Sequence, residues 1–470
     1  MRQWMVAAKK ADFYAIAEKF HVDPVVARII RNREVIGEKN IRIYLGGNLS
    51  DLSDPHQMKD MDRLVEILAQ KIRKQVHIRI IGDYDVDGVT SSHLFLTALR
   101  RVGAKVDVVI PHRIQDGYGL SLHLLQQAKE DGVDTILTCD NGIAAIDEIA
   151  WAKAQKMTVL VTDHHAVPFE EHEGRRTEKK SLADAVVNPH QQDCGYPYKE
   201  LCGAGVAWNV IRVLYENYDM DKREAEDLLD FVAMATVCDV MSLTGENRIL
   251  VKEGLKRIRH TKNIGLQALM QACNVQPENI SAYHFGYVLG PCVNATGRLD
   301  TARHALRLFE TGQETEAEEI ARDLVDLNQE RKELTLQGVE MAKKLCEEGG
   351  YENDPVLVLF LPDVHESIAG LIAGRIREMY NRPVFVLTRG EEGVKGSGRS
   401  TENYSMYENM CGCAELFTKF GGHPMAAGLS LPEENVEKFR RKINENCPLT
   451  VEEVCPDIHI DMAMPVGYAS

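Results

Sequence analysis

The chain has 470 residues, of which 44% are hydrophobic and 27% are charged, an ordinary composition for a globular protein of about three domains. Its 55 Lys and Arg against 71 Asp and Glu give a net charge of −16, so a nucleic-acid-binding surface would have to be local. No run approaches the roughly 18 apolar residues of a membrane-spanning helix. The amino-terminus lacks the apolar core of a signal peptide, and the 11 cysteines form no CxxC pair. We therefore expect a protein of the reducing cytoplasm with no membrane partner.

Helical and strand patterns alternate from Met61 onwards. Short apolar runs rich in β-branched residues predict strands near 76–82, 105–110, 134–139, 157–162 and 184–187, with helices between them. This alternation is typical of an α/β protein with a doubly wound parallel sheet. A charged loop is expected over 170–180, and a helix over 225–237 leads to Asp239.

A long charged helical pattern over 314–348 is expected to join this first lobe to a smaller α/β lobe that begins near 355. The chain is thus predicted to contain an amino-terminal arm (1–60), a first α/β domain (61–262), a helical connector (263–350), a second α/β domain (351–450) and the start of a further domain (451–470).

Three acidic residues follow the first predicted strand at alternate positions, Asp83, Asp85 and Asp87. Carboxylates crowded at one point repel one another and raise each other's pKa, unless cations lie among them. Hard divalent cations prefer oxygen ligands, so this stretch favours Mg²⁺ or Mn²⁺. An acidic turn with an Asp helix cap would contain the same residues without a metal, and this stretch alone leaves both interpretations open.

Potential ligands also follow two later strands. Asp140 comes after the run 135–139, and Asp163, His164 and His165 come after the run 158–162. Because the carboxyl ends of parallel strands meet at one edge of a sheet, we expect these side chains to gather there. Asp239, at the end of an apolar helical pattern, is a further candidate.

Taken together, GDYDVDG (82–88), DNG (140–142), DHH (163–165) and the lone Asp239 resemble the four metal-binding motifs of the DHH phosphoesterase superfamily. The first motif is spelled like that of the superfamily's RecJ branch, the single-strand-specific 5′-to-3′ DNA exonucleases. NATGRL (294–299), GSGRS (396–400) and GGHPMAAG (421–428) resemble further motifs of that branch in the same order. The resemblance covers residues 60 to 450, and the joint occurrence of seven motifs is highly specific.

The resemblance implies a metal-dependent exonuclease of single-stranded DNA that acts in DNA repair and recombination and holds two Mn²⁺ or Mg²⁺ ions. The implied metal ligands are Asp85, Asp87, Asp140, His164 and Asp239. Implied catalytic or supporting residues are Asp83, Asp163, His165 and His423. Asp163 would orient an imidazole, and His165 would contact the scissile phosphate. Implied contacts to substrate phosphates, including a Gly-rich turn, are Arg113, Asn294, Arg298, Gly396, Ser397, Gly398, Arg399, Ser400 and Gly422.

Two alternatives were weighed against this interpretation. One is a hydrolase of short oligonucleotides or cyclic dinucleotides from the same superfamily. The other is a replication scaffold without activity, which predicts lost ligands, whereas all five ligands are present. We expect a monomer whose partners are single-stranded DNA and, as candidates, a single-strand-binding protein or a helicase. The resemblance also places the end of this chain where the family's OB-fold begins, which predicts weak, strongly salt-dependent binding to long strands.

Overall fold

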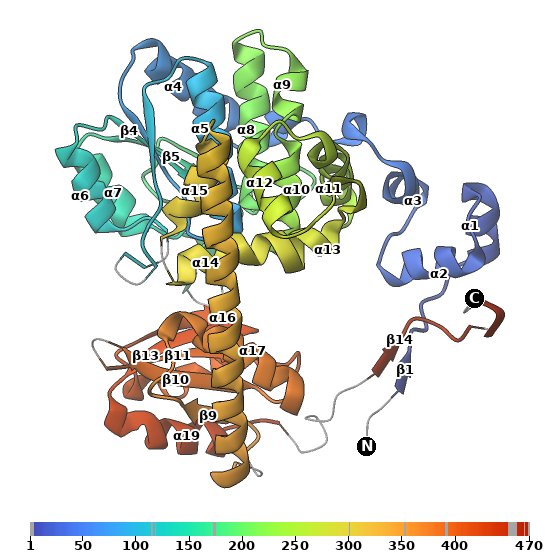
Figure 1. Ribbon diagram of the computed structural model, residues 1–470, viewed down its shortest axis with the longest axis vertical. Coiled ribbons are helices and arrows are strands. Elements are labelled where there is room, and N and C mark those ends of the chain that lie inside the picture. Colours follow the sequence, from blue (N-terminus) through green and yellow to red (C-terminus); the bar gives the residue numbers. More distant parts are fainter. Residues whose placement is uncertain are drawn as a thin grey trace. The chain divides into compact units, whose positions relative to one another are not determined.

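The computed structural model describes residues 4–113, 116–117, 119–172, 175–299, 301–351, 354–390, 393–449, 458–464 and 466–468. The chain divides into two compact units (Figure 1). The larger unit comprises Val35–Asn328, and the smaller unit comprises Met1–Glu34 together with Gln329–Ser470. Part of the predicted carboxyl-terminal segment (451–470), including residues 451–457, lies outside the described residues.

The larger unit contains a parallel sheet with the strand order β3-β2-β4-β5-β8. Its strands are β2 (Ile78–Ile81), β3 (Val106–Val109), β4 (Thr135–Cys139), β5 (Thr158–Thr162) and β8 (Ala185–Val187). These five strands lie where the sequence predicted them, and the predicted α/β class is confirmed. After β2 the chain continues to β3, on one side of β2, and after β4 it continues to β5, on the opposite side. The carboxyl ends of β2 and β4 therefore flank a topological switch point. Open α/β sheets bind ligands at such points.

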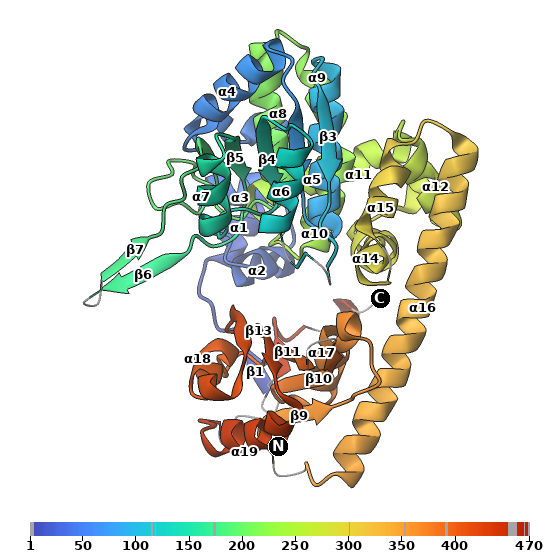
Figure 2. The same cartoon turned by 90° about the vertical axis from the view of Figure 1, so that its left-hand side faces the viewer.

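Helices cover both faces of this sheet because its strands are apolar on both sides (Figure 2). Ile80 packs with the core under α4 (Met61–Arg73), α5 (Val86–Arg101) and α8 (Gly203–Asn217). Its neighbour Ile81 points to the opposite face, which α6 (Leu122–Glu130) and α7 (Ile146–Ala154) cover. The alternation follows from the two-residue period of a strand.

Apart from a hairpin over 169–178, the other regular elements of the larger unit are helical. They include α3 (Glu38–Gly46), α9 (Lys222–Glu226), α10 (Leu229–Cys238), α11 (Gly245–Arg257), α12 (Ile264–Ala272), α13 (Ala282–His284), a π-helical turn (Phe285–Leu289), α14 (Gly290–Leu299) and α15 (Ala302–Glu310). The predicted connecting helix is α16 (Glu314–Glu348), which begins in the larger unit and ends in the smaller one.

The smaller unit contains a mixed sheet with the order β12-β13-β11-β10-β9. Its strands are β9 (Leu357–Phe360), β10 (Val384–Gly390), β11 (Gly393–Arg399), β12 (Lys419–His423) and β13 (Ala426–Leu431). One face packs against α17 (Ala369–Tyr380) and the other against α18 (Met406–Cys411) and α19 (Val436–Glu445). In the same unit, β1 (Trp4–Val6) pairs in parallel with β14 (Ile458–Ile460). Two helices, α1 (Phe13–Phe20) and α2 (Pro24–Asn32), follow β1 in the sequence.

The prediction of a charged loop over 170–180 is wrong. Instead, β6 (Phe169–His172) and β7 (Arg175–Glu178) form an antiparallel hairpin there (Figure 2). The Arg176 guanidinium lies 4.5 Å from the centre of the Phe169 ring, and Glu170 pairs with Lys179 at 3.0 Å. Opposite charges facing each other across a ladder stabilise strands, so a charged sequence does not exclude a hairpin.

Among the residues that the structure describes, no helix combines the length and the apolar character needed to cross a membrane. The 35-residue α16 is long enough, but it is strongly charged along its length.

The buried His93 makes the stability of the larger unit sensitive to acid. Its ring lies 4.4 Å from Phe231 and 5.8 Å from Phe309, and burial, followed by the nearby Arg100 guanidinium, lowers its pKa to about 3. An unfolded histidine has a pKa of about 6.5, so between these values the unfolded chain binds the extra proton and stability falls as pH falls.

We therefore predict that, as pH falls, the free energy of unfolding declines more steeply in the wild type than in His93→Leu. Between pH 6.5 and 4 the two slopes should differ by about 1.4 kcal/mol per pH unit. Denaturant titrations at a series of pH values measure this difference. Burial raises the pKa of Asp230 to about 6, which acts in the opposite direction, but both proteins retain Asp230. Parallel pH profiles for the two proteins would contradict the prediction.

Candidate metal centre

The predicted ligands meet at the carboxyl edge of the parallel sheet, around the switch point between β2 and β4. Asp83, Asp85 and Asp87 follow β2, and Asp140 follows β4. The 163–165 motif follows β5, and Asp239 is the residue that ends α10. The sequence thus predicted correctly that one edge of the sheet collects these side chains.

Short-range contacts fix the first two motifs. The Asp85 side chain caps α5 by accepting a hydrogen bond from Gly88 N at 3.0 Å. A side chain at position 88 would collide with the backbone of Asp83, so this tight turn requires glycine. Asn141 Nδ2 donates to the carbonyls of Ile81, at 3.0 Å, and Cys139, at 2.9 Å, which ties the ends of β2 and β4 together.

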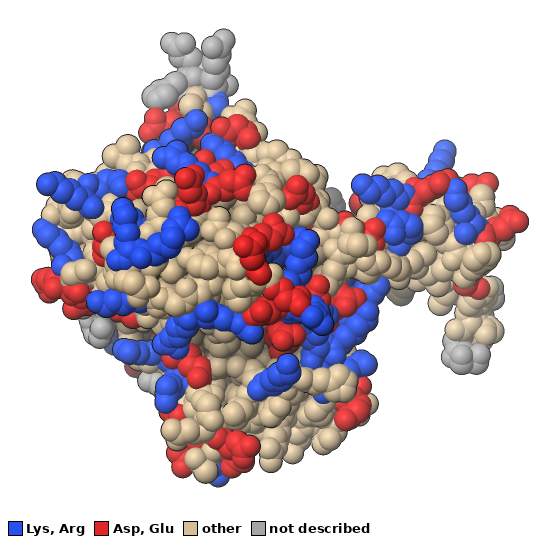
Figure 3. Space-filling view, turned by 90° about the horizontal axis from the view of Figure 1, so that it is seen from above, with Lys and Arg blue, Asp and Glu red and all other residues tan. Residues whose placement is uncertain are grey.

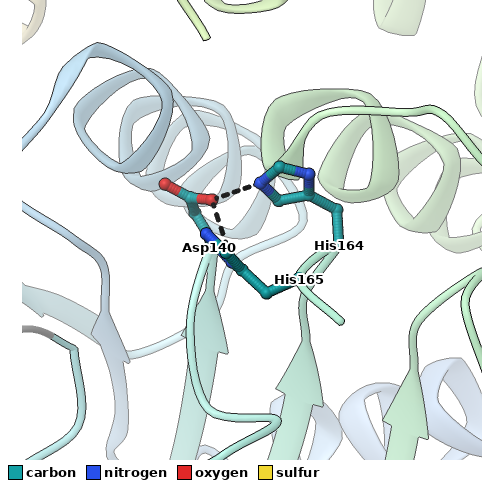
Figure 4. A group of neighbouring side chains, drawn as sticks. All are labelled: Asp140, His164 and His165. Carbon is teal, nitrogen blue, oxygen red and sulfur yellow. Dashed lines mark ion pairs between the residues drawn. The ribbon is translucent and has the colours of Figure 1, made fainter. Parts of the chain in front are cut away.

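His164 lies at the centre of the cluster. Its Nε2 atom is 3.1 Å from Asp140 Oδ1, 3.7 Å from Asp87 Oδ2 and 3.6 Å from Asp239 Oδ2. Figure 4 shows the His164 ring directed at the Asp140 carboxylate. One imidazole and three carboxylates therefore converge on one small volume.

Three overlapping groups of residues present ligand atoms within 4.8 Å of one another. They are Asp87 with His164 and Asp239, Asp140 with His164 and His165, and Asp83 with Asp85 and Asp140. Asp140 belongs to two of these groups. Its Oδ1 atom also lies 3.1 Å from Nε2 of His164, which belongs to the group with Asp87 and Asp239. It is the side chain that joins the cluster together.

The amino-terminus of α8 holds Asp87, a contact that sequence reasoning missed. Gly203 N donates to Asp87 Oδ2 at 2.6 Å and Ala204 N donates to Asp87 Oδ1 at 2.7 Å. A Cβ atom on residue 203 would lie 2.6 Å from Cβ of Asp140, so glycine allows the helix to approach. Helix amino-termini stabilise anions. The Gly-Ala-Gly run over 203–205 that opens this helix is the sequence signal for this contact.

Burial and mutual repulsion make the carboxylates hard to ionise. Burial, followed by the charge on Asp85, raises the pKa of Asp83 well above its usual range. Burial and the neighbouring Asp87 and Asp85 carboxylates likewise raise the pKa of Asp140 strongly and that of Asp239 to about 8. Burial and Asp87 also raise the pKa of Asp85. Without cations, the cluster is electrostatically unfavourable at neutral pH.

The two histidines of the 163–165 motif differ in their surroundings. Burial lowers the pKa of His165, but the hydrogen bond between its Nδ1 and Asp163 Oδ1, at 2.8 Å, and the nearby carboxylates raise it to about 9. For His164 burial dominates, and its pKa is lowered. Asp163 Oδ1 also accepts from His164 N at 2.7 Å, and its Oδ2 accepts from Ile143 N at 2.9 Å. Asp163 therefore orients the motif.

This donor set fits divalent cations. A carboxylate-rich cluster with one imidazole of lowered pKa offers the oxygen and neutral nitrogen ligands that Mn²⁺ and Mg²⁺ accept. The predicted ligands Asp85, Asp87, Asp140, His164 and Asp239 all belong to it, as does Asp83, and Asp83 Oδ1 also accepts from Gly119 N at 3.3 Å.

Three predicted phosphate contacts of the larger unit lie beside this cluster. The Arg113 guanidinium is 4.9 Å from the centre of the Tyr84 ring, and Arg113 and Arg298 both act electrostatically on the Tyr84 hydroxyl. Asn294 Oδ1 accepts a hydrogen bond from Val86 N at 3.2 Å. Asn294 therefore holds the backbone of the first motif. Tyr118, in the loop that follows Arg113, lies outside the described residues.

In the smaller unit, the predicted Gly-rich turn over 396–400 is wrong, because β11 runs through Arg399. Its glycines fit a packed face of the sheet: a side chain at 396 would collide with Leu387, and one at 398 would lie 2.5 Å from Met406 Sδ. The alternate residues Ser397 and Arg399 therefore point to the opposite face, where Arg399 Nη1 donates to Ser397 Oγ at 3.2 Å.

Ser400 does not fit its predicted role. It is fully buried, and its hydroxyl donates to the Tyr404 carbonyl at 2.5 Å. Gly422 has a φ of +153°, and a side chain there would crowd the backbone of Ala427. His423 ends β12 with an exposed side chain.

The start of α17 lies close to Ser397 and Arg399. A Cβ atom on Gly370 would lie 2.8 Å from both Ser397 Oγ and Arg399 Nη2, so glycine lets the first turn of the helix approach this pair. The Ser367 hydroxyl and His365 Nδ1, 2.7 Å apart, lie just before that turn in the sequence. Backbone N–H groups of a helix start next to a hydroxyl and a guanidinium are groups that favour an anion.

Comparisons with known proteins agree with this arrangement. Residues 77–236 match the model of the DHH family, N-terminal domain, and residues 353–447 match that of the DHHA1 domain. The single-stranded-DNA-specific exonuclease RecJ of Haemophilus influenzae is 36% identical over 440 residues, which cover 90% of this chain and 74% of that protein. The chain belongs to the RecJ family.

Other RecJ proteins extend the comparison. RecJ of Bacillus subtilis is 33% identical over 96% of this chain, and the match spans 56% of that protein. The crystal structure of RecJ from Thermus thermophilus in complex with Mn²⁺ superimposes with a TM-score of 0.78 at 27% identity, covering 97% of this chain and 64% of that one. A RecJ exonuclease structure bound to manganese has a TM-score of 0.71 at 32% identity, covering 83% of this chain and 94% of that one. The predicted Mn²⁺ or Mg²⁺ dependence is thus supported by RecJ structures solved with these metals.

We predict that Mn²⁺ at about 100 times its Kd stabilises the wild-type protein by about 2.7 kcal/mol, and that Asp140→Asn loses most of this gain. In chelator, the variant should be at least as stable as the wild type, because it removes one of several repelling carboxylates while preserving the side-chain volume. Denaturant unfolding with and without Mn²⁺ measures both effects.

Glu66→Gln, which changes an exposed acid on α4, is the matched control and should respond to Mn²⁺ like the wild type. An equal Mn²⁺-dependent gain in Asp140→Asn would show that the metal binds elsewhere.

Proposed function

We propose that this protein is a metal-dependent exonuclease that removes nucleotides from the 5′ end of single-stranded DNA by hydrolysing phosphodiester bonds. One observation carries the proposal: six acidic and imidazole side chains of a RecJ-family chain converge around Asp140 at the switch point of its parallel sheet. The H. influenzae and B. subtilis relatives are named as single-stranded-DNA-specific exonucleases. The reaction polarity and the residue roles below are part of the proposal.

Two divalent cations, when bound, would supply a nucleophilic water and neutralise the charge that develops on the phosphate. The protein holds the ligands in place before any cation arrives. The α8 amino-terminus fixes both oxygens of Asp87, and Asp163 fixes the 164–165 backbone and the His165 ring. We propose that His165, oriented in this way, donates a hydrogen bond to the scissile phosphate.

Cationic side chains would then position the strand. Arg113 and Arg298 flank Tyr84 beside the cluster, and planar guanidinium groups bind phosphate oxygens bidentately. In the smaller unit, Ser397, Arg399 and the start of α17 are the proposed contacts to a terminal 5′ phosphate. His423, at the end of β12, is a proposed supporting residue for catalysis.

Single-stranded DNA is the proposed substrate, and the protein partners are a separate part of the proposal. A single-strand-binding protein or a helicase is the proposed protein partner, the proposed state is a monomer, and the proposed setting is DNA repair and recombination in the cytoplasm.

Digestion of single strands labelled at one end tests the activity and its polarity. With Mn²⁺, a 5′-labelled strand should release its label at once as a mononucleotide, whereas a 3′-labelled strand should shorten progressively. Asp140→Asn, or excess chelator, should abolish both reactions. Cleavage of only dinucleotides or cyclic dinucleotides would support the other superfamily activity, and full activity in chelator would contradict the metal mechanism.

The proposed terminal-phosphate contact makes a separate prediction. A strand with a 5′ phosphate should be cut faster than one with a 5′ hydroxyl, and Arg399→Ala should reduce this preference by about ten- to a hundredfold because a charge-assisted hydrogen bond of about 1.5–3 kcal/mol is lost. Arg375→Ala is the matched control, since Arg375 is an exposed arginine on α17 whose 3.6 Å ion pair is with Glu378. A preference unchanged in Arg399→Ala would place the phosphate site elsewhere.

A further inference from the structure

Two exposed tyrosines stack on each other in the larger unit, on the helical segment that precedes Asn294. The ring centroids of Tyr283 and Tyr287 are 5.1 Å apart, and the ring planes differ by 22°. The side chains are 62% and 72% exposed, while Phe285 and Leu289, on the same turns, are completely buried. The core is therefore filled by the buried pair, and the tyrosines add nothing to it.

The tyrosines begin a row of side chains that ends at Arg298. Helix α13, the π-helical turn and α14 follow one another without a break from Ala282 to Leu299. Residues three or four apart lie on one face of a helix. The positions 283, 287, 291, 294 and 298 have this spacing and all keep solvent exposure, whereas 285, 289, 292, 293 and 295–297 are buried.

The same segment packs against the metal centre. The Cys238 thiol donates to the Phe285 carbonyl at 3.3 Å, which joins the π-helical turn to the end of α10, next to Asp239. Further along, Asn294 accepts a hydrogen bond from Val86 N, and a Cβ atom on Gly297 would lie 2.5 Å from the Tyr84 carbonyl oxygen. The segment therefore contacts the metal-centre motifs at two points, and Tyr283 and Arg298 are about 20 Å apart along it, at a rise of 1.5 Å per residue.

We propose that Tyr283 and Tyr287 form a stacking site for a base of the single strand, a few nucleotides away from the bond that is cut. The inference rests on the proposed function and extends it to a substrate contact outside the metal centre. Proteins that bind single strands combine a track of cations with aromatic rings on which bases stack irrespective of sequence. Here Arg298 supplies a cation and the tyrosines supply the rings, on one continuous helical segment.

Two further observations favour nucleic acid as the occupant. The π-helical turn, which contains Tyr287, interrupts the regular helical hydrogen bonding of this segment, and such turns are frequent at functional sites. The chain carries a net charge of −16, and Lys and Arg are interspersed with Asp and Glu on the face seen in Figure 3. General electrostatic attraction is therefore weak, and stacking would contribute a larger share of the affinity for a strand.

The test compares a long single strand with a dinucleotide, which has no base a few nucleotides away from the bond that is cut. The double variant Tyr283→Leu/Tyr287→Leu should raise KM for the long strand about five- to a hundredfold, the loss expected for one stacked base, with kcat little changed. Its kinetics on the dinucleotide should match the wild type. Tyr283→Phe/Tyr287→Phe retains both rings and should behave like the wild type on both substrates.

Tyr14→Leu, at another exposed tyrosine with 78% exposure, is the control for loss of a surface ring and should change neither KM. Placing a fluorescent base analogue at successive positions of the strand locates the contact. Binding to the wild type should quench the analogue at one interior position, and the Leu variant should lose this quenching while it retains Mn²⁺-dependent stabilisation.

An unchanged KM of the Leu variant for the long strand would overturn the proposal and would leave the tyrosines to another partner such as a protein. An equal rise in KM for the dinucleotide would also overturn it. If the Leu variant fails to fold, absence of quenching at every interior position in the wild type still overturns it. Failure of the proposed function would be seen differently, as wild-type protein that binds and quenches the strand without cutting it.

Discussion

The structure depends on keeping several carboxylates close together in a place that water hardly reaches. Asp83, Asp87 and Asp140 are almost completely buried, and burial and mutual repulsion raise the pKa values of Asp83, Asp85, Asp140 and Asp239. Such a cluster costs free energy in a metal-free protein. Divalent cations would offset that cost, so the residues that make the fold less stable alone are also the candidate metal ligands.

Much of the larger unit serves to hold this cluster together. The parallel sheet brings three motifs to one edge, and glycine at 88 and at 203 allows a close approach to the Asp83 backbone and to the Asp140 side chain, which a Cβ atom would prevent. The α8 amino-terminus supplies two N–H donors to Asp87, and Asp163 supplies the acceptor that orients His165. These fixed contacts mean that little reorganisation is needed when cations bind, which is the condition for effective electrostatic catalysis.

The sequence predicted the parts of this arrangement that are local. The strands β2, β4 and β5 are apolar runs that each lead into a candidate ligand, so these strands and the ligand edge could be located from Ile81, Cys139 and Thr162. The contact between Asp87 and Gly203 joins residues 116 positions apart and has no local signature. The hairpin at 169–178 was missed because its charged side chains pair across the strands. The strand at 396–399 was predicted as a turn because no local pattern shows that its glycines face bulky residues distant in the sequence, and Ser400 was predicted to contact a phosphate although it is buried.

Crystals of the protein grown or soaked with Mn²⁺ and examined by anomalous diffraction test the central claim most directly. The account predicts two manganese peaks within this cluster, with Asp140 contacting both and with Asp87, His164 and Asp239 among the ligands of one of them. Absence of any peak among these residues at saturating Mn²⁺, with the carboxylates held instead by hydrogen bonds to one another or to water, would contradict it.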